Sequence, residues 1–140
     1  MTTATVPIRI LIANGEPICR AGLRHMLEGE PDLGVVGETG DGAEVTELAR
    51  SLHPHVLLLD PDMPGLGRLE ALSRLTEGNG HLSTLLLASS LDHDRLVEAV
   101  RLGVRGVLSK RASRDELLKA VRLVSAGTLQ RLTGAEPDGA

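Results

Sequence analysis

The chain has no phenylalanine, tyrosine or tryptophan among its 140 residues. Proteins that bind single-stranded nucleic acid stack bases on such rings, so this mode of recognition is excluded. A single cysteine excludes an internal disulfide framework and a multi-cysteine zinc site. No apolar run approaches the roughly 20 residues that a membrane-spanning helix needs, so no membrane contact is expected.

Positive charge is also scarce, and nearly all of it is arginine. The 15 Lys and Arg face 19 Asp and Glu, which gives a formal net charge of -4 and argues against binding of a phosphate backbone by this chain. Only Lys110 and Lys119 are lysines, which suggests a role for a compact ammonium group at these positions. The first residues lack a charged and apolar secretion signal, so we expect a soluble cytoplasmic protein.

Short apolar runs alternate with longer amphipathic stretches along the chain. Strands are predicted at residues 8–13, 33–37, 56–60, 82–88 and 104–108. Helices are predicted from Pro17 to the stop at Gly29, from Asp41 to a stop at His53-Pro54, around residues 69–75, over 95–102, and from a capping box at Ser113 to a stop at Gly127. Strict alternation of strands and helices predicts an α/β domain with a parallel sheet covered on both faces.

Ligands of such folds bind beyond the carboxyl ends of the strands. This rule selects a candidate site without any knowledge of function, and its residues follow four of the predicted strands: Asn14, Gly15, Glu16, Asp60, Ser89 and Lys110.

The candidate site contains an acid, a hydroxyl and an amine at the ends of the third, fourth and fifth strands. Asp60 could attack phosphorus as a carboxylate nucleophile. Ser89 could then donate to a phosphoryl oxygen, and Lys110 could neutralise its charge. The alternative is structural: Asp60 and Lys110 form an ion pair and Ser89 only ends a strand.

Several motifs resemble those of a known family. VLLLDPDMPG (56–65) resembles the phosphorylation-site strand and loop of response regulator receiver domains, and IRILIANGEPICRAG (8–22) resembles the first strand and helix of the NarL/FixJ (LuxR-type) branch. VVGETGDGAE (35–44), LEAL (69–72) and GVLSK (106–110) also fit this branch, so the resemblance runs from about residue 7 to 127. It implies a flavodoxin-like (CheY-like) fold, with five helices around five parallel strands in the order 2-1-3-4-5.

The resemblance assigns roles to individual residues. It places Asp60 at the phospho-acceptor position, Ser89 at the switch Ser/Thr position and Lys110 at the phosphate-contacting lysine position. Val107 stands where the family usually has an aromatic switch residue, and a stiff valine has no ring to rotate between two states.

The acidic pocket departs from the family pattern. Receivers of this branch usually read Asp-Asp-His-Pro after the first strand, whereas this chain has Asn14, Gly15 and Glu16 before the proline. Because Mg²⁺ depends on carboxylate ligands, we expect no cofactor, or Mg²⁺ bound only weakly. Asp60 and Asp62 are the weak candidates for metal ligands.

The resemblance and its departures together lead to a functional hypothesis. We expect residues 1–128 to form a receiver domain that is not an enzyme and acts as a regulatory and dimerisation module in a transcriptional regulator, largely without aspartyl phosphorylation. Residues 129–140 are expected to form a flexible tail or the start of a linker.

Two alternative functions remain at this point. One is a conventional receiver phosphorylated at Asp60 by a histidine kinase, and the other is a small-molecule sensor that uses the vacated pocket. The expected partners are a second copy or a related receiver, and a kinase in the first alternative. Contact with DNA is expected only through a separate helix-turn-helix domain.

Overall fold

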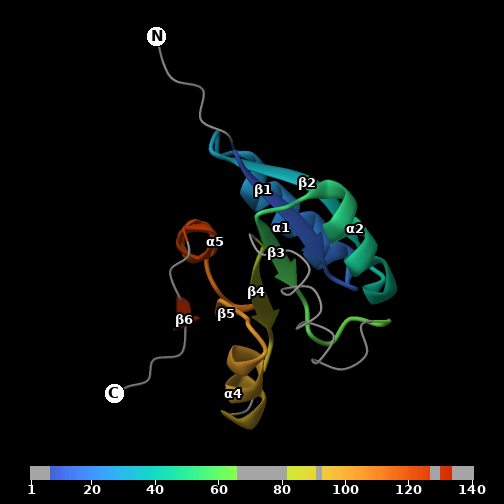
Figure 1. Cartoon of the computed structure of the whole chain (residues 1–140). Coiled ribbons are helices and arrows are strands. Elements are labelled where there is room, and N and C mark those ends of the chain that lie inside the picture. Colours follow the sequence, from blue (N-terminus) through green and yellow to red (C-terminus); the bar gives the residue numbers. More distant parts are fainter. Residues whose placement is uncertain (1–6, 66–81, 91–92, 127–129, 134–140) are drawn as a thin grey trace.

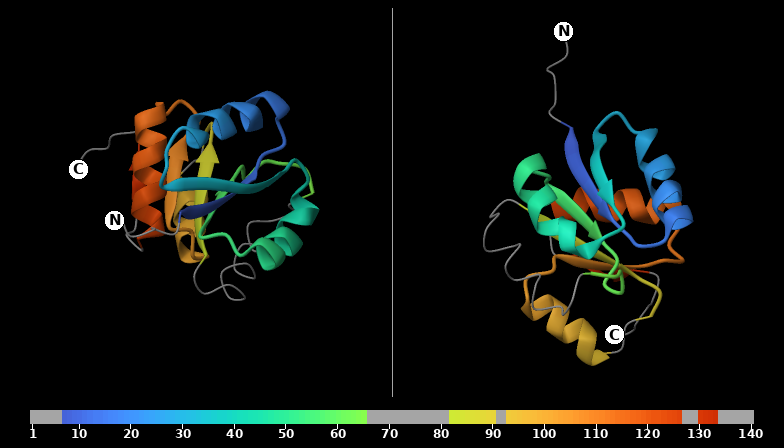
Figure 2. Two further views of the ribbon diagram at one scale, coloured as in Figure 1. Left: turned by 90° about the horizontal axis from the view of Figure 1, so that it is seen from above. Right: turned by 90° about the vertical axis from the view of Figure 1, so that its right-hand side faces the viewer.

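The computed structural model describes residues 7–65, 82–90, 93–126 and 130–133. A central parallel sheet crosses the molecule, with helices packed on both of its faces (Figures 1 and 2). Along the chain the elements are β1 (Ile8–Ala13), α1 (Pro17–Glu28), β2 (Leu33–Thr39), η1 (Gly42–Glu44), α2 (Val45–Leu52), β3 (Val56–Leu59), β4 (Ser83–Ala88), α4 (His93–Arg101), β5 (Gly106–Ser109), α5 (Arg114–Ser125) and β6 (Gln130–Thr133). None of the helices in the described ranges is long and apolar enough to cross a membrane.

The sheet has the strand order that the sequence predicts, and one strand more. The order is β2-β1-β3-β4-β5-β6, so the expected 2-1-3-4-5 arrangement is confirmed. The additional strand β6 pairs in parallel with β5, with Gly106 opposite Gln130 and Leu108 opposite Thr133. Four residues of the segment expected to be a flexible tail therefore form the edge of the sheet beside β5 (Figure 1).

The predicted helices agree with the structure apart from their ends. Pro17 begins α1, and Ser113 caps α5 in a capping box with Glu116. His53 ends α2 in a left-handed conformation, with φ of 51°, just before Pro54. The stretch expected to be helical from residue 41 begins as the 3-10 turn η1, and the helix predicted around residues 69–75 lies outside the described residues.

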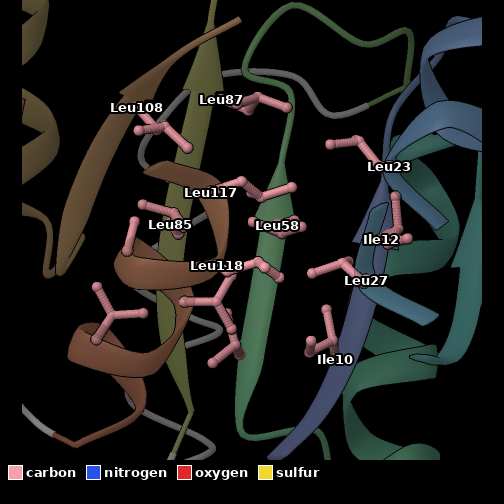
Figure 3. Packing of buried hydrophobic residues seen from close by; sticks show 14 of the residues in the cluster. Ile10, Ile12, Leu23, Leu27, Leu58, Leu85, Leu87, Leu108, Leu117 and Leu118 are labelled. Carbon is pink, nitrogen blue, oxygen red and sulfur yellow. The ribbon is translucent and has the colours of Figure 1, made fainter. Parts of the chain in front are cut away.

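The core is built from branched aliphatic side chains in two layers. On one face of the sheet α1 and α5 cover a cluster of buried residues centred on β3, and Figure 3 shows this packing. Leu58 of β3 is paired with Ile12 of β1 on one side and with Leu85 of β4 on the other. The opposite face, under α2 and α4, buries Leu57, Leu59 and Val107. Burial of β3 on both faces explains why its sequence is apolar at every position.

Candidate functional site

Backbone hydrogen bonds bring the ends of the strands to one edge of the sheet. The N–H of Asn14 donates to the carbonyl of Thr39, and the N–H of Asp60 donates to the carbonyl of Ala13, at distances of 3.0 and 2.9 Å. The N–H of Lys110 donates to the carbonyl of Ala88, also at 3.0 Å. Asn14, Asp60 and Lys110 directly follow β1, β3 and β5. Each therefore adds one more hydrogen bond to the parallel sheet, and all three lie at its carboxyl edge.

Asp60 and Lys110 meet at this edge. Their carboxylate Oδ2 and ammonium Nζ are 3.5 Å apart, and the Asp60 side chain is only 5% exposed. The other carboxylate oxygen, Oδ1, accepts a hydrogen bond of 3.0 Å from the backbone N–H of Asp62. Both oxygens of Asp60 thus have a donor or cation beside them. The structure brings together the residues that the family resemblance names as acceptor and phosphate contact.

Glu16 is the second carboxylate of the site. Its Oε1 lies 3.1 Å from the Lys110 ammonium, so one cation is shared by Glu16 and Asp60. Partial burial lowers the pKa of Lys110, but the hydrogen bond to Glu16 and the negative charge of Asp60 raise that pKa by more, so it lies above its ordinary value. Lys110 is therefore a fixed positive charge at neutral pH, and the three groups together have a formal charge of -1.

Asn14 is a buried amide whose oxygen and nitrogen each make a local contact. Its Oδ1 accepts the backbone N–H of Glu16 at 2.8 Å, and its Nδ2 donates to the Cys19 sulfur at 3.3 Å. Its backbone carbonyl accepts from the Arg20 guanidinium at 2.6 Å. These contacts make the segment from β1 into α1 a tight turn. They confirm that Asn14-Gly15 marks a turn, while the amide itself is held toward α1.

The loop after β3 closes the space beside Gly15. A Cβ added to Gly15 would lie 2.8 Å from Cδ of Pro64, which is closer than carbon atoms approach one another. Pro64 is itself anchored, because its carbonyl accepts the N–H of Gly42 at 2.7 Å. Gly65, the next residue, has a φ of +86° that a glycine adopts without strain. A side chain at position 15, which usually carries the second acid of a receiver, would thus meet the ring of Pro64.

The remaining predicted site residues lie apart from this pair. Asp62 is exposed and forms an ion pair of 3.5 Å with Arg95 of α4. Ser89 directly follows β4 and is exposed, and among the described residues no hydrogen bond joins it to Asp60 or Lys110. Val107 is 2% exposed within the core of the α2 and α4 face. A side chain so enclosed, with one preferred χ1, has no room to alternate between two positions.

The carboxylates of the site bear on Mg²⁺, the metal that the family resemblance implies. Mg²⁺ needs near-octahedral oxygen ligands, of which proteins usually supply one or two carboxylates. Within the described ranges, no group of three or more His, Cys, Asp or Glu side chains is placed to hold a metal ion. Asp60 is directed to Lys110, Glu16 to the same ammonium, and Asp62 to Arg95. Each carboxylate of the site is therefore already paired with a cation of the protein.

Sequence reasoning missed two contacts that shape the site. The Glu16–Lys110 ion pair joins residues 94 positions apart, and the clash of Pro64 with any side chain at position 15 joins two loops. The scarcity of lysine pointed to Lys110 but not to its second partner. No local signal predicted the contact of Pro64 with position 15. The motif that contains Pro64 predicts a loop, whichever segment packs against that loop.

Comparisons with known proteins agree with this fold and this edge. Residues 10–122 match the family described as response regulator receiver domain. The nitrate/nitrite response regulator protein NarL of Escherichia coli K12 is 35% identical over 123 residues, which are 88% of this chain and 57% of NarL. The chain therefore spans little more than half the length of this curated relative.

Solved structures give the same result. The signal receiver domain of the response regulator NarL from Mycobacterium tuberculosis superposes with a TM-score of 0.83 at 28% identity, covering 88% of this chain and 99% of that domain. The isolated receiver domain of RcsB from Salmonella enterica serovar Typhimurium, solved in the presence of the phosphomimetic BeF3-, superposes with a TM-score of 0.80 at 25% identity, covering 89% and 93%. Receiver domains of this kind are regulatory rather than catalytic. The chain therefore belongs to the response regulator receiver domains, and within them to the NarL/LuxR type of two-component regulator.

Proposed function

We propose that this receiver domain regulates through contacts with another receiver and does not depend on magnesium-assisted phosphorylation of Asp60. The observation that carries the proposal is the state of the acidic pocket: among the described residues Asp60 is the one buried carboxylate at the strand edge, and a side chain at position 15 would meet Pro64. The family fold is retained while the pocket lacks the ligands for the ion that receivers use.

The charges of the site support this proposal. A phosphoryl group adds about 1.5 to 2 negative charges, and phosphoryl transfer depends on cations that offset the charge developing in the transition state. In this pocket Lys110 is already shared between Asp60 and Glu16, so no positive charge is left over. An added phosphoryl group would face a net negative site, which disfavours both its transfer to Asp60 and its retention there.

The first experiment tests the conventional alternative, in which Asp60 accepts a phosphoryl group. The protein is incubated with acetyl phosphate and Mg²⁺ and its intact mass is measured, with Asp60→Asn as the matched control. We expect no phosphate adduct on either protein. An adduct that forms on the natural chain and is lost in Asp60→Asn would overturn the proposal.

Beryllofluoride tests the same pocket without any chemistry. The RcsB receiver was solved with BeF3- and serves as the positive control. Mg²⁺ and then BeF3- are added to each protein. In this chain the amide shifts of Asn14, Asp60 and Lys110 are followed, and in RcsB those of the corresponding residues. We expect saturable shifts in RcsB and none at low millimolar Mg²⁺ in this chain. Saturation by Mg²⁺ in that range would count against the proposal.

The partners are part of the same proposal. Receivers of this family interact with histidine kinases and with other receivers. For this chain we favour a second copy or a related receiver, because such contacts need no phosphate. Any action on DNA would belong to a separate domain of a longer protein.

A further inference from the structure

A partly open cavity of about 150 Å³ lies beside the acidic edge, on the face of the sheet covered by α1 and α5. Its wall is mostly apolar and includes Leu23 and Met26 of α1, Leu108 of β5 and Leu117 of α5. Lys110 and Cys19 add polar groups to the same wall. This cavity is distinct from the vacated acid position, where a side chain would meet Pro64.

Gly22 keeps the cavity wide. It lies in the interior of α1. Glycine is less favourable there than alanine, because glycine loses more backbone conformational entropy on folding. A Cβ added to Gly22 would meet no atom within 4 Å, so no neighbour requires a glycine at this position. Gly22 lines the cavity, and a larger side chain there would project into it.

The polar end of the cavity favours an uncharged oxygen. The Lys110 ammonium has three N–H donors, of which the structure directs two to Glu16 and Asp60. The formal charge of these three groups is -1, which disfavours an anionic ligand nearby. Ser109, on the same wall, accepts the backbone N–H of Arg111 through its Oγ at 3.0 Å, which leaves its own O–H free to donate. Of these two donors on the cavity wall, the third N–H of Lys110 is charged and is therefore the stronger one for a neutral carbonyl or hydroxyl oxygen.

We propose that this cavity binds a small uncharged molecule with an apolar body and one carbonyl or hydroxyl oxygen. An apolar cavity of about 150 Å³ accommodates a ring of the size of benzene, which limits the ligand to about six to eight non-hydrogen atoms. The apolar body packs against the leucines of α1, β5 and α5, and the oxygen accepts a hydrogen bond from Lys110. This inference rests on the proposed function in one respect: Asp60 carries no phosphoryl group that would engage Lys110.

Cyclohexanone is a suitable probe, and Cys19 reports on its binding. Cys19 is the only cysteine of the chain, so the rate of reaction with a thiol reagent measures access to this wall. We expect cyclohexanone to slow the reaction at least several-fold in a saturable manner, and to shift the amide signals of Gly22, Leu108 and Ala112. Cyclohexanecarboxylate, which has a similar body but a negative charge, should bind more weakly.

Gly22→Leu tests the location, with His25→Leu as its matched control on the exposed side of the same helix. The first change should abolish protection of Cys19 and the amide shifts, and the second should leave both intact. The titration of the natural chain is decisive without either variant: no saturable effect of cyclohexanone overturns the proposal. Equal binding to the Gly22→Leu variant would place the probe elsewhere, and tighter binding of the carboxylate would refute the role of the neutral oxygen.

Discussion

The contact between Gly15 and Pro64 links two loops at the level of single atoms. Receivers with an aspartate at this position must leave room for its side chain, whereas here Cδ of Pro64 lies 2.8 Å from where a Cβ would be. The glycine and the closed loop are therefore coupled, and returning an acid to position 15 is more than one change. Backbone conformation is not the obstacle, because Gly65 and Gly103 are the glycines with positive φ in the described ranges.

Two glycine-to-alanine changes should have opposite effects on stability. Gly15→Ala overpacks the loop against Pro64, and we expect it to lower the free energy of unfolding by about 1–3 kcal/mol. Gly22→Ala adds a methyl group to an open space in a helix interior, and we expect a gain of about 0.5–1 kcal/mol. Urea denaturation followed by circular dichroism measures both.

A second substitution, at Pro64, tests whether the clash with Pro64 causes the loss of stability in Gly15→Ala. Pro64→Ala removes the atom nearest to the added Cβ, so in the Gly15→Ala background it should recover part of the lost stability. A Gly15→Ala variant as stable as the natural chain would show that the loop gives way freely, and the coupling of the two positions would then be wrong.

The sequence identified Asp60, Lys110 and Asn14 as members of one edge because parallel strands end together, and this rule needs no knowledge of side chains. The sharing of Lys110 by Glu16 could not be predicted in this way. Glu16 belongs to a turn, and the direction of a turn side chain depends on the exact path of the backbone between Asn14 and Pro17. Contacts of this kind become visible only in three dimensions.

At the scale of elements, β3 is the centre of the molecule. Leu58 is 1% exposed and lies between β1 and β4 in the cluster that α1 and α5 cover (Figure 3). Without aromatic rings, the core depends on close interdigitation of such side chains. We expect Leu58→Ala to lower the free energy of unfolding by roughly 2–5 kcal/mol.

The matched control for this core change is on the surface. Val100 of α4 is 46% exposed, so Val100→Ala should change stability by less than about 0.5 kcal/mol. Thermal and urea unfolding of both variants compare the two sites directly. A loss below about 1 kcal/mol for Leu58→Ala would be outside the range for buried leucines and would contradict the central place of β3.

An ion-pair cluster fastens α5 to the segment between α1 and β2. Arg122 binds Asp32 through two hydrogen bonds of 2.9 Å and Glu30 through one of 2.7 Å, and Arg114 adds a contact of 2.9 Å to Glu30. The hydrogen bond from Arg122 lowers the pKa of both carboxyl groups below their ordinary values. A carboxyl with a lowered pKa contributes to stability above its unfolded-state pKa and ceases to do so as the pH falls through its folded-state pKa.

Arg122→Gln should therefore destabilise the domain at pH 7 and have little effect in strong acid. The unfolded-state values are 4.5 for Glu30 and 3.8 for Asp32, so the difference between the two proteins should shrink as the pH falls below about 4.5. Urea denaturation at a series of pH values measures this difference in the free energy of unfolding.

The control is Arg50→Gln, which breaks an exposed ion pair with Glu47 and should have no measurable effect at any pH. A constant difference from pH 7 to pH 2 would show that Arg122 acts by packing alone.

Local patterns predicted most elements because each has its own signal: period and length for the helices, apolar runs for the strands, and Pro17 and Ser113 at helix starts. The strand β6 has no such signal. Gln130–Thr133 contains one apolar residue, and its pairing is with β5, across the whole of α5. The strand lies at the sheet edge because the chain crosses over through α5 and returns beside β5 (Figure 1). This crossover belongs to the tertiary fold and leaves no signal in the four residues themselves.

At the scale of the whole molecule, the question is which surface is available to a partner. Leu118 and Val121 are apolar residues of the last helix, and apolar helix residues are the side chains that a dimer contact would use. They are 4% and 0% exposed and belong to the core, so they are not available to a partner. Helical residues alternate between faces at a period of 3.6, and the face of α5 that carries them packs on the sheet.

Ile18 is the apolar side chain that the structure leaves most available among the described residues, at 89% exposed. It lies in the first turn of α1, beside the site edge, with the exposed Pro17 and Ala21 next to it. We expect a homodimer that forms without phosphate and buries this turn, since burial of exposed apolar area favours association. Light scattering at high micromolar concentration should give a mass above that of the 14.8 kDa monomer.

Replacement of single side chains locates the contact. Ile18→Glu should shift the protein to monomer, because it would bury an unpaired charge in the interface. Val97→Glu makes the same kind of change on α4, where the valine is 43% exposed, and should leave the dimer intact. A monomer in the natural protein at high micromolar concentration would remove the homodimer and leave a related receiver as the expected partner. Loss of the dimer in Val97→Glu with retention in Ile18→Glu would move the interface to α4, which lies on the opposite face of the sheet from α1 (Figure 2).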